Sequence, residues 1–166
     1  MIEHISIPEE RIALLRKTKG WKEDIKKFLD VNVEIGEDIA VSGDVLQVIR
    51  VKEIFRAFGR GFTFKDSLDL LDDEYVLYVI TISEFAGKSK NRQTTLKGRI
   101  IGEGGKTKTM IEKYTNVKIA VYGKTVSMIG KAEGIIIAKE AIEMLLYGGK
   151  HATVYRFLED KKILAF

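Results

Sequence analysis

A glycine-bounded turn surrounded by cations is the part of this sequence whose residue types point most clearly to a chemistry. Residues 97–108 read Lys-Gly-Arg-Ile-Ile-Gly-Glu-Gly-Gly-Lys-Thr-Lys and lie between two segments with helical spacing of apolar residues. Glycines in such a turn let the backbone of a polyanion come close to the peptide backbone. The turn and its cations therefore predict nucleic-acid binding, with phosphate groups as the first ligands.

The charge of the chain is concentrated around this turn. The formal net charge of +4 over 166 residues is only mildly basic. Residues 88–118, however, contain nine basic and two acidic side chains, whereas residues 61–87 contain one basic and six acidic side chains. A local excess of cations attracts phosphates, although a solvated lysine-rich face is the usual alternative. The glycine turn favours the binding interpretation.

Composition argues against several classes of function. The chain has no cysteine, and its two histidines, His4 and His151, lie near opposite ends. We therefore expect no metal site, no cofactor and no Cys/His catalysis. No apolar run approaches the roughly 20 residues of a membrane span, which predicts a soluble, cytoplasmic protein without a membrane partner.

Nucleotide hydrolysis is the enzymatic alternative, because Gly105-Lys106-Thr107 copies the end of a phosphate-binding P-loop. That motif requires a glycine five positions before Gly105, where Ile100 stands. It also requires a strand before the loop, whereas the spacing of apolar residues predicts a helix there. We therefore expect a protein that is not an enzyme and has no catalytic residues.

The elements that must position the turn follow from apolar periodicity. In the second half the pattern predicts a strand over 75–82, a basic helix over 89–101, a second helix over 107–114, strands over 117–121 and 126–129, and a long helix over 132–147. The same order is predicted in the first half, with strand 2–7, a helix carrying Ile12 and Leu15, a helix carrying Trp21, Ile25, Phe28 and Leu29, strands near 31–35 and 39–41, and a long helix from 45 to 58.

The two halves align at an offset of 86 residues, which places Ile25 on Ile111 and Phe28 on Tyr114. We interpret the chain as a duplicated α+β unit. The first copy keeps one glycine, Gly20, at its turn. The aromatic rings of Trp21, Tyr114 and Tyr122 either stack on bases or, as is more common at such spacing, belong to the core.

The expected domain organisation has four parts. The first copy occupies 1–62, an acidic linker or helix follows at 63–74, the second copy occupies 75–149, and a C-terminal helical extension at 150–166 carries Val154, Phe157, Leu158 and Leu164.

The string Ile101-Gly102-Glu103-Gly104-Gly105 resembles the I-G-x-x-G core of KH domains, and the strand and helix that follow match the type I order. The longer string from 98 to 108 resembles the second KH domain of the partner-of-Nob family, a set of small-subunit ribosomal RNA maturation factors. The resemblance implies two tandem type I KH domains (βααββα), the first of which lacks the GxxG glycines.

In KH domains the GxxG turn and its neighbouring helices clamp about four nucleotides of single-stranded backbone. Carried over to this sequence, the resemblance assigns phosphate contacts to cations beside the turn, an apolar floor for bases to Ile100 or Ile101, and base readout to the strand over 118–122. The implied RNA-binding residues are Lys97, Arg99, Ile100, Ile101, Gly102, Glu103, Gly104, Gly105, Lys106, Lys108 and Lys118.

Glu103 departs from the common pattern, since many nucleic-acid-binding members have a cation inside the turn. Either this carboxylate points away from the RNA or the turn binds weakly by itself, and the surrounding positive charge favours the first interpretation. The resemblance further implies single-stranded RNA as ligand, specifically the 3′ end region of small-subunit ribosomal RNA, location on pre-ribosomal particles, and a ribosome-maturation endonuclease or translation-factor partner. A protein-interaction scaffold with weak or no RNA binding is the alternative.

Overall fold

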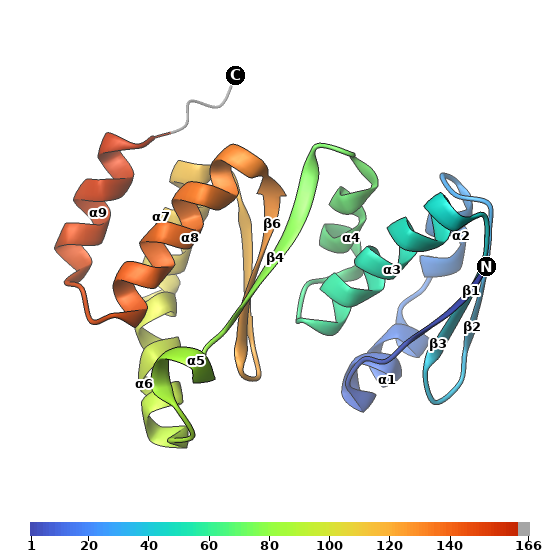
Figure 1. Cartoon of the computed structure of the whole chain (residues 1–166), viewed down its shortest axis with the longest axis horizontal. Coiled ribbons are helices and arrows are strands. Elements are labelled where there is room, and N and C mark those ends of the chain that lie inside the picture. Colours follow the sequence, from blue (N-terminus) through green and yellow to red (C-terminus); the bar gives the residue numbers. More distant parts are fainter. Residues whose placement is uncertain (163–166) are drawn as a thin grey trace. The chain divides into compact units, whose positions relative to one another are not determined.

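The computed structural model describes residues 1–162, which divide into two compact units, residues 1–73 and the residues from Glu74 onward. Leu164, which we assigned to the C-terminal helix, lies outside the described residues. Figure 1 shows helices and a small sheet in each unit. The expectation of an α+β protein with a helical C-terminal region is confirmed.

The first unit is built around a three-stranded antiparallel sheet of order β1-β3-β2. Its elements are β1 (Ile2–Ile5), α1 (Glu9–Lys17), α2 (Trp21–Lys26), β2 (Val31–Ile35), β3 (Ile39–Gly43), α3 (Val45–Gly59), α4 (Phe64–Ser67) and the 3-10 helix η1 (Leu68–Leu71).

The second unit repeats this plan with a sheet of order β4-β6-β5. Its elements are β4 (Tyr75–Thr81), α5 (Ser83–Ala86), α6 (Lys90–Ile101), the 3-10 helix η2 (Glu103–Gly105), α7 (Lys106–Thr115), β5 (Lys118–Tyr122), β6 (Thr125–Lys131), α8 (Ala132–Leu146) and α9 (His151–Asp160). The short helix α5 was not predicted from the sequence.

The core of the second unit lies between the sheet and helices α6, α7 and α8, which cover one of its faces (Figure 1). Ile100, Ile111 and Ile142 contribute fully buried side chains from these three helices. Apolar residues recur every three or four positions along each helix, so one stripe faces the sheet and removes its area from water. The core therefore fixes the relative position of α6 and α7, and with them the turn between these helices.

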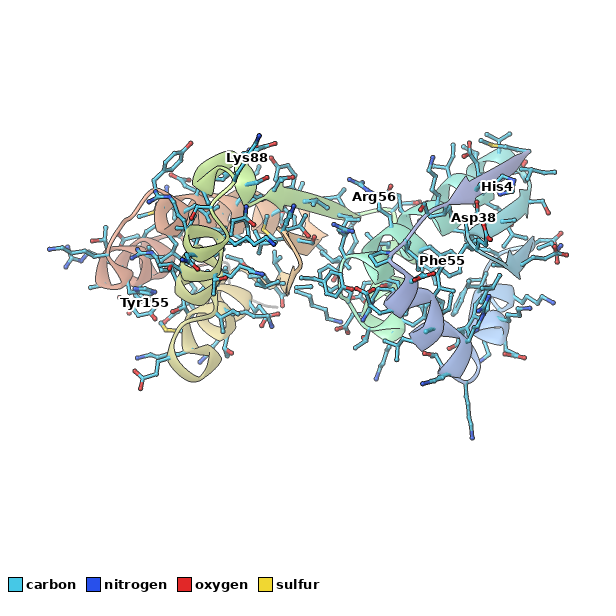
Figure 2. All side chains as sticks on the ribbon, turned by 90° about the horizontal axis from the view of Figure 1, so that it is seen from below. His4, Asp38, Phe55, Arg56, Lys88 and Tyr155 are labelled. Carbon is cyan, nitrogen blue, oxygen red and sulfur yellow. The ribbon has the colours of Figure 1, made fainter. Side chains whose placement is uncertain are left out.

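An aromatic cluster fills the core of the first unit. The Trp21 ring lies edge-on to Phe55, with 5.9 Å between centroids, and edge-on to Phe64 at 6.3 Å (Phe55 is labelled in Figure 2). Trp21 is only 6% exposed, so its ring belongs to the core and is not available for stacking on a base. Phe28, by contrast, lies beyond the end of α2 and is 64% exposed, so its expected place in a helix was wrong.

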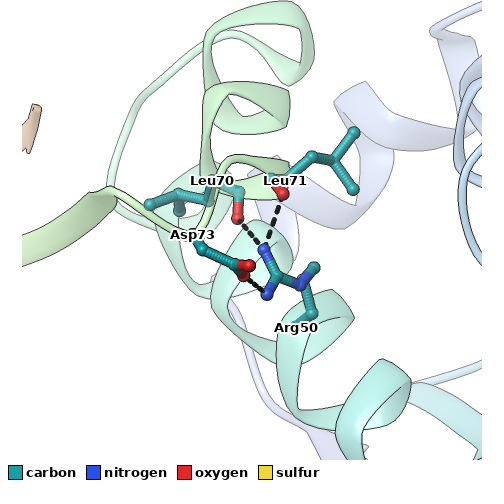
Figure 3. Close-up of polar contacts among 4 residues, drawn as sticks. All are labelled: Arg50, Leu70, Leu71 and Asp73. Atoms are coloured by element: carbon teal, nitrogen blue, oxygen red, sulfur yellow. Dashed lines mark hydrogen bonds and ion pairs between the residues drawn. The ribbon is translucent and has the colours of Figure 1, made fainter.

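The acidic segment that follows α3 folds onto the first unit. Arg50 of α3 donates through Nη1 to the carbonyl oxygens of Leu71, at 2.6 Å, and Leu70, at 3.2 Å, and through Nη2 to the carboxylate of Asp73 (Figure 3). One guanidinium thus satisfies the last carbonyls of η1, which have no partner within the helix. The segment is held against α3 by these bonds.

Candidate nucleic-acid interface

The turn between α6 and α7 requires glycine at three of its four positions. Gly102 has φ 75° and ψ 172°, Gly104 has φ 60° and ψ 20°, and Gly105 has φ 77° and ψ 10°. These backbone conformations are costly for residues with a Cβ atom, and that of Gly102 is almost exclusive to glycine. The sequence Gly-Glu-Gly-Gly is therefore the local cause of the turn.

The room for a Cβ atom differs between these glycines. A Cβ atom on Gly102 would overlap the Thr107 side chain and lie 2.8 Å from the Thr107 backbone nitrogen, because α7 begins directly against this residue. A Cβ atom on Gly104 or Gly105 would meet nothing within 4 Å. Gly102 thus serves close packing inside the unit, whereas Gly104 and Gly105 leave open space beside the backbone, where a ligand can approach.

The two apolar residues predicted as a floor for bases lie in different environments. Ile100 is fully buried in the core of the second unit, so it has no surface to offer a base. Ile101, the last residue of α6, is 37% exposed. The apolar contact predicted for this pair can therefore come only from Ile101.

Arg99, predicted to contact phosphate, is engaged inside the unit. Its Nε donates to the Leu145 carbonyl oxygen at 3.1 Å, and its Nη2 donates to the Gly149 carbonyl oxygen. Both acceptors lie where α8 ends, and helix-terminal carbonyls need such partners. The guanidinium therefore joins α6 to the end of α8, which is a structural role that the sequence reasoning did not identify.

The lysines around the turn differ in how far they are engaged. Lys106, the first residue of α7, is exposed, and its Nζ lies 5.6 Å from the ring centroid of Tyr155. Lys108 Nζ lies 3.3 Å from a carboxylate oxygen of Glu112. Lys97 Nζ donates to the Gly123 carbonyl oxygen at 2.8 Å, in the turn that joins β5 to β6. Lys118 is exposed at the start of β5. The turn is thus flanked by cations of α6 and α7, of which Lys106 is the nearest to the glycines in sequence, whereas Lys118 follows the opposite end of α7.

The C-terminal helix α9 supports the turn, which the sequence did not suggest. The hydroxyl of Tyr155 lies 2.8 Å from Thr107 Oγ1 (Tyr155 is labelled in Figure 2), and His151 Nε2 lies 3.0 Å from the Arg99 carbonyl oxygen. Val154 and Leu158 are fully buried in the core of the unit. The helix therefore holds the end of α6 and the start of α7 through one polar contact each.

The corresponding connection in the first unit is built differently. Helix α1 continues to Lys17, and of residues 18–20 only Gly20 has positive φ, at 79°. Gly20 precedes α2 as Gly105 precedes α7, and both have left-handed backbone conformations. A Cβ atom on Gly20 would also meet nothing within 4 Å, so the last glycine of the turn is kept, whereas Gly102 and Gly104 have no glycine counterpart in the first unit.

The described residues carry neither of two other kinds of functional feature. None of their helices is both long and apolar enough to cross a membrane. Within 1–162 no group of three or more His, Cys, Asp or Glu residues is placed to hold a metal ion.

Comparisons with known proteins agree with this geometry. Residues 76–163 match the model of the second KH domain of PNO1, described as a eukaryotic type KH domain of type I. A KH domain-containing protein of Methanocaldococcus jannaschii is 44% identical over 97% of this chain and 74% of its own length. A pre-rRNA-processing protein, pno1 of Schizosaccharomyces pombe, is 31% identical over 65% of this chain, which spans 45% of that relative.

Solved structures resemble nearly the whole length of the chain. One is a crystal structure of an a/eIF2alpha, aDim2p and rRNA complex from Pyrococcus horikoshii OT3, in which a chain 34% identical to this one superposes with a TM-score of 0.87. The match covers 97% of this chain and 93% of that one.

Proposed function

This chain belongs to the PNO1 family of KH-domain proteins, and we propose on this premise that it is a single-stranded RNA-binding protein of pre-rRNA processing. The observation that carries the proposal is the turn at 102–105, where the backbone of Gly104 and Gly105 is open and Lys106 follows directly. Such a turn admits a phosphodiester backbone to hydrogen-bonding distance, as KH domains require. The named functions of the relatives point in the same direction.

The RNA that we propose is the 3′ end region of small-subunit ribosomal RNA. The resemblance of residues 98–108 to small-subunit maturation factors supports this choice, as does a similar chain in a complex with rRNA. We propose contacts to the RNA backbone from Lys106 and Lys108, a base contact from Ile101, and further contacts from Lys97 and Lys118. Glu103 is exposed, so it can turn toward water.

We propose that the first unit is a second type I KH domain without a phosphate clamp, with the domain division 1–62, 63–74, 75–149 and 150–166. Its element order and sheet order match those of the second unit, which supports a duplication. Its turn keeps only the last of the glycines, Gly20, so we assign it to protein contacts. A translation factor related to a/eIF2alpha is the partner favoured by the solved complex, and a maturation endonuclease is the other.

The protein acts in this proposal without catalysis, on cytoplasmic pre-ribosomal particles. The alternative is a scaffold that binds only proteins, which the engagement of Arg99 within the unit makes worth testing. Clamp and scaffold differ in one measurable property, the affinity for free single-stranded RNA.

The test is a titration with a short RNA that copies the mature small-subunit 3′ terminus, at low and moderate salt. Gly104→Asp places a carboxylate in the open turn, and Gly104→Asn is the matched control, because both residues tolerate left-handed backbone and only one is charged. We expect the Asp variant to bind at least tenfold more weakly than the Asn variant. Equal RNA affinities of the Asp and Asn variants would contradict phosphate binding at the turn. If the unmodified protein bound no RNA, the result would favour a scaffold that binds only proteins.

A further inference from the structure

The free edge of the second sheet has one backbone donor that is already occupied. Strand β5 is the last strand in the order β4-β6-β5, so within residues 1–162 one of its edges has no neighbouring strand. In an antiparallel pair, alternate residues turn their N–H and C=O groups away from the partner strand. Ile119 is such a residue, because its N–H donates to the carboxylate of Glu112 at 3.0 Å.

Glu112 projects from α7, the helix that begins directly after the glycine turn. One carboxylate oxygen accepts the Ile119 N–H, and the other lies 3.3 Å from Lys108 Nζ. The side chain is 28% exposed, so solvent and ligands can reach it. An ionised carboxylate has about four lone-pair sites and no donor, so acceptor capacity remains after both contacts.

This arrangement changes what the strand edge offers to a base. An unoccupied edge residue presents an N–H donor beside a C=O acceptor, which matches the adjacent acceptor and donor of adenine (N1 and N6) and of cytosine (N3 and N4). With the Ile119 N–H occupied, the edge presents the Ile119 carbonyl and the Glu112 carboxylate, which are both acceptors. Guanine is the base whose Watson–Crick edge has two adjacent donors, N1–H and N2–H.

We infer that Glu112 is a specificity-determining residue that makes the edge of β5 at Ile119 select guanine. The inference rests on the proposed function, since it assumes that single-stranded RNA lies along the turn and β5. Lys108 fixes one carboxylate oxygen and Ile119 the other, so the acceptors are held in place before RNA binds, and little side-chain entropy is lost on binding.

The first unit shows that this carboxylate is not a general feature of the repeat. At the offset of 86 residues, Lys26 stands in the place of Glu112 and Lys22 in the place of Lys108. A small cavity beside β2 is lined by these two lysines and by Val31 and Val33, among other residues. The acceptor is therefore specific to the unit that carries the open glycine turn.

The test compares four eight-nucleotide RNAs that alternate uridine with guanosine, inosine, adenosine or cytidine, by fluorescence anisotropy at low salt. Inosine keeps N1–H and lacks the 2-amino group, so it removes one of the two donors. We expect the unmodified protein to prefer the guanosine RNA over the adenosine and inosine RNAs by at least about fivefold.

Two variants separate the acceptor from the fold. Glu112→Ala frees the Ile119 N–H, and we expect it to lose the guanosine preference and to gain affinity for the adenosine RNA. Glu112→Gln retains an oxygen for the Ile119 N–H but places a donor group beside it, so we expect a reduced guanosine preference in a folded protein. Glu140→Ala, which removes an exposed carboxylate of α8, controls for the change in net charge.

A guanosine-to-adenosine affinity ratio that is near one in the unmodified protein, or that stays unchanged in both Glu112 variants, would overturn the inference while leaving RNA binding intact. If the unmodified protein bound none of the four RNAs, the proposed function and the inference would fail together.

Discussion

Arg11 of α1 and Arg99 of α6 make matching pairs of hydrogen bonds in the two units. Arg11 Nε donates to the Phe58 carbonyl oxygen at 2.9 Å, and its Nη2 donates to that of Phe62 at 2.6 Å. Arg99 makes the same two bonds to carbonyl oxygens four residues apart at the end of α8. A guanidinium suits this task because its donors form a rigid fork. Each unit therefore uses one arginine to bind the carbonyl oxygens at the end of its long helix, although at the offset of 86 residues Arg99 falls on Ala13 and not on Arg11.

We expect Arg99→Lys to destabilise the protein by about 2 kcal/mol, because one ammonium cannot satisfy two carbonyls in the geometry of a guanidinium. Thermal or urea unfolding measures the change. Arg92→Lys, at an exposed position of the same helix, is the control and should leave the unfolding midpoint unchanged. Equal stability of the two variants would argue that Arg99 is free to contact RNA instead.

Gly102→Ala and Gly104→Ala should differ although both lie in one turn. The first adds a Cβ atom that overlaps Thr107 in a backbone conformation reserved for glycine, and we expect a loss of at least about 3 kcal/mol. The second meets open space in left-handed backbone, which costs about 1 kcal/mol. Chemical denaturation of both variants tests whether Gly102 serves close packing and Gly104 faces open space. Similar losses of unfolding free energy in the two variants would contradict this difference.

Tyr155→Phe should weaken the support that α9 gives to the turn. The hydroxyl contact with Thr107 is lost and leaves the buried Thr107 Oγ1 without that partner, so we expect a loss of about 1 kcal/mol in unfolding free energy. Tyr147→Phe, at a position 78% exposed, is the matched control and should be neutral. Faster hydrogen exchange of amides near residue 107 in the Tyr155 variant would locate the effect, and unchanged exchange would contradict it.

Lys106 and Lys108 should contribute unequally to RNA binding. Lys106→Gln removes an exposed cation, and we expect the slope of log affinity against log salt to become shallower by about 0.7. Lys108→Gln removes a cation whose charge Glu112 already offsets, so we expect a smaller change. RNA titrations of both variants at several salt concentrations measure the two changes in slope. An equal or larger change for Lys108→Gln would contradict the prediction.

Several elements of the fold were predictable because local pattern and tertiary structure agree there. The alternation around Ile119 and the helical stripe through Ile111 correspond to β5 and α7, since buried faces follow the period of each element. Phe28 was misplaced because an aromatic residue at helical spacing favours a buried position, whereas α2 ends at Lys26 and leaves the ring exposed. The end of a helix is decided by packing as much as by local propensity.

In the candidate site, too, some features follow from the sequence and others only from the tertiary structure. The sequence by itself determined the turn, because only glycine adopts its backbone conformations at low cost, and it determined the excess of cations around the turn. Only the tertiary structure decided which cations remain available, since Arg99 reaches carbonyls some 46 and 50 residues away and Lys108 meets Glu112. Side chains with many rotatable bonds take their partners from whatever the fold brings near, and residue spacing along the chain does not encode that neighbourhood.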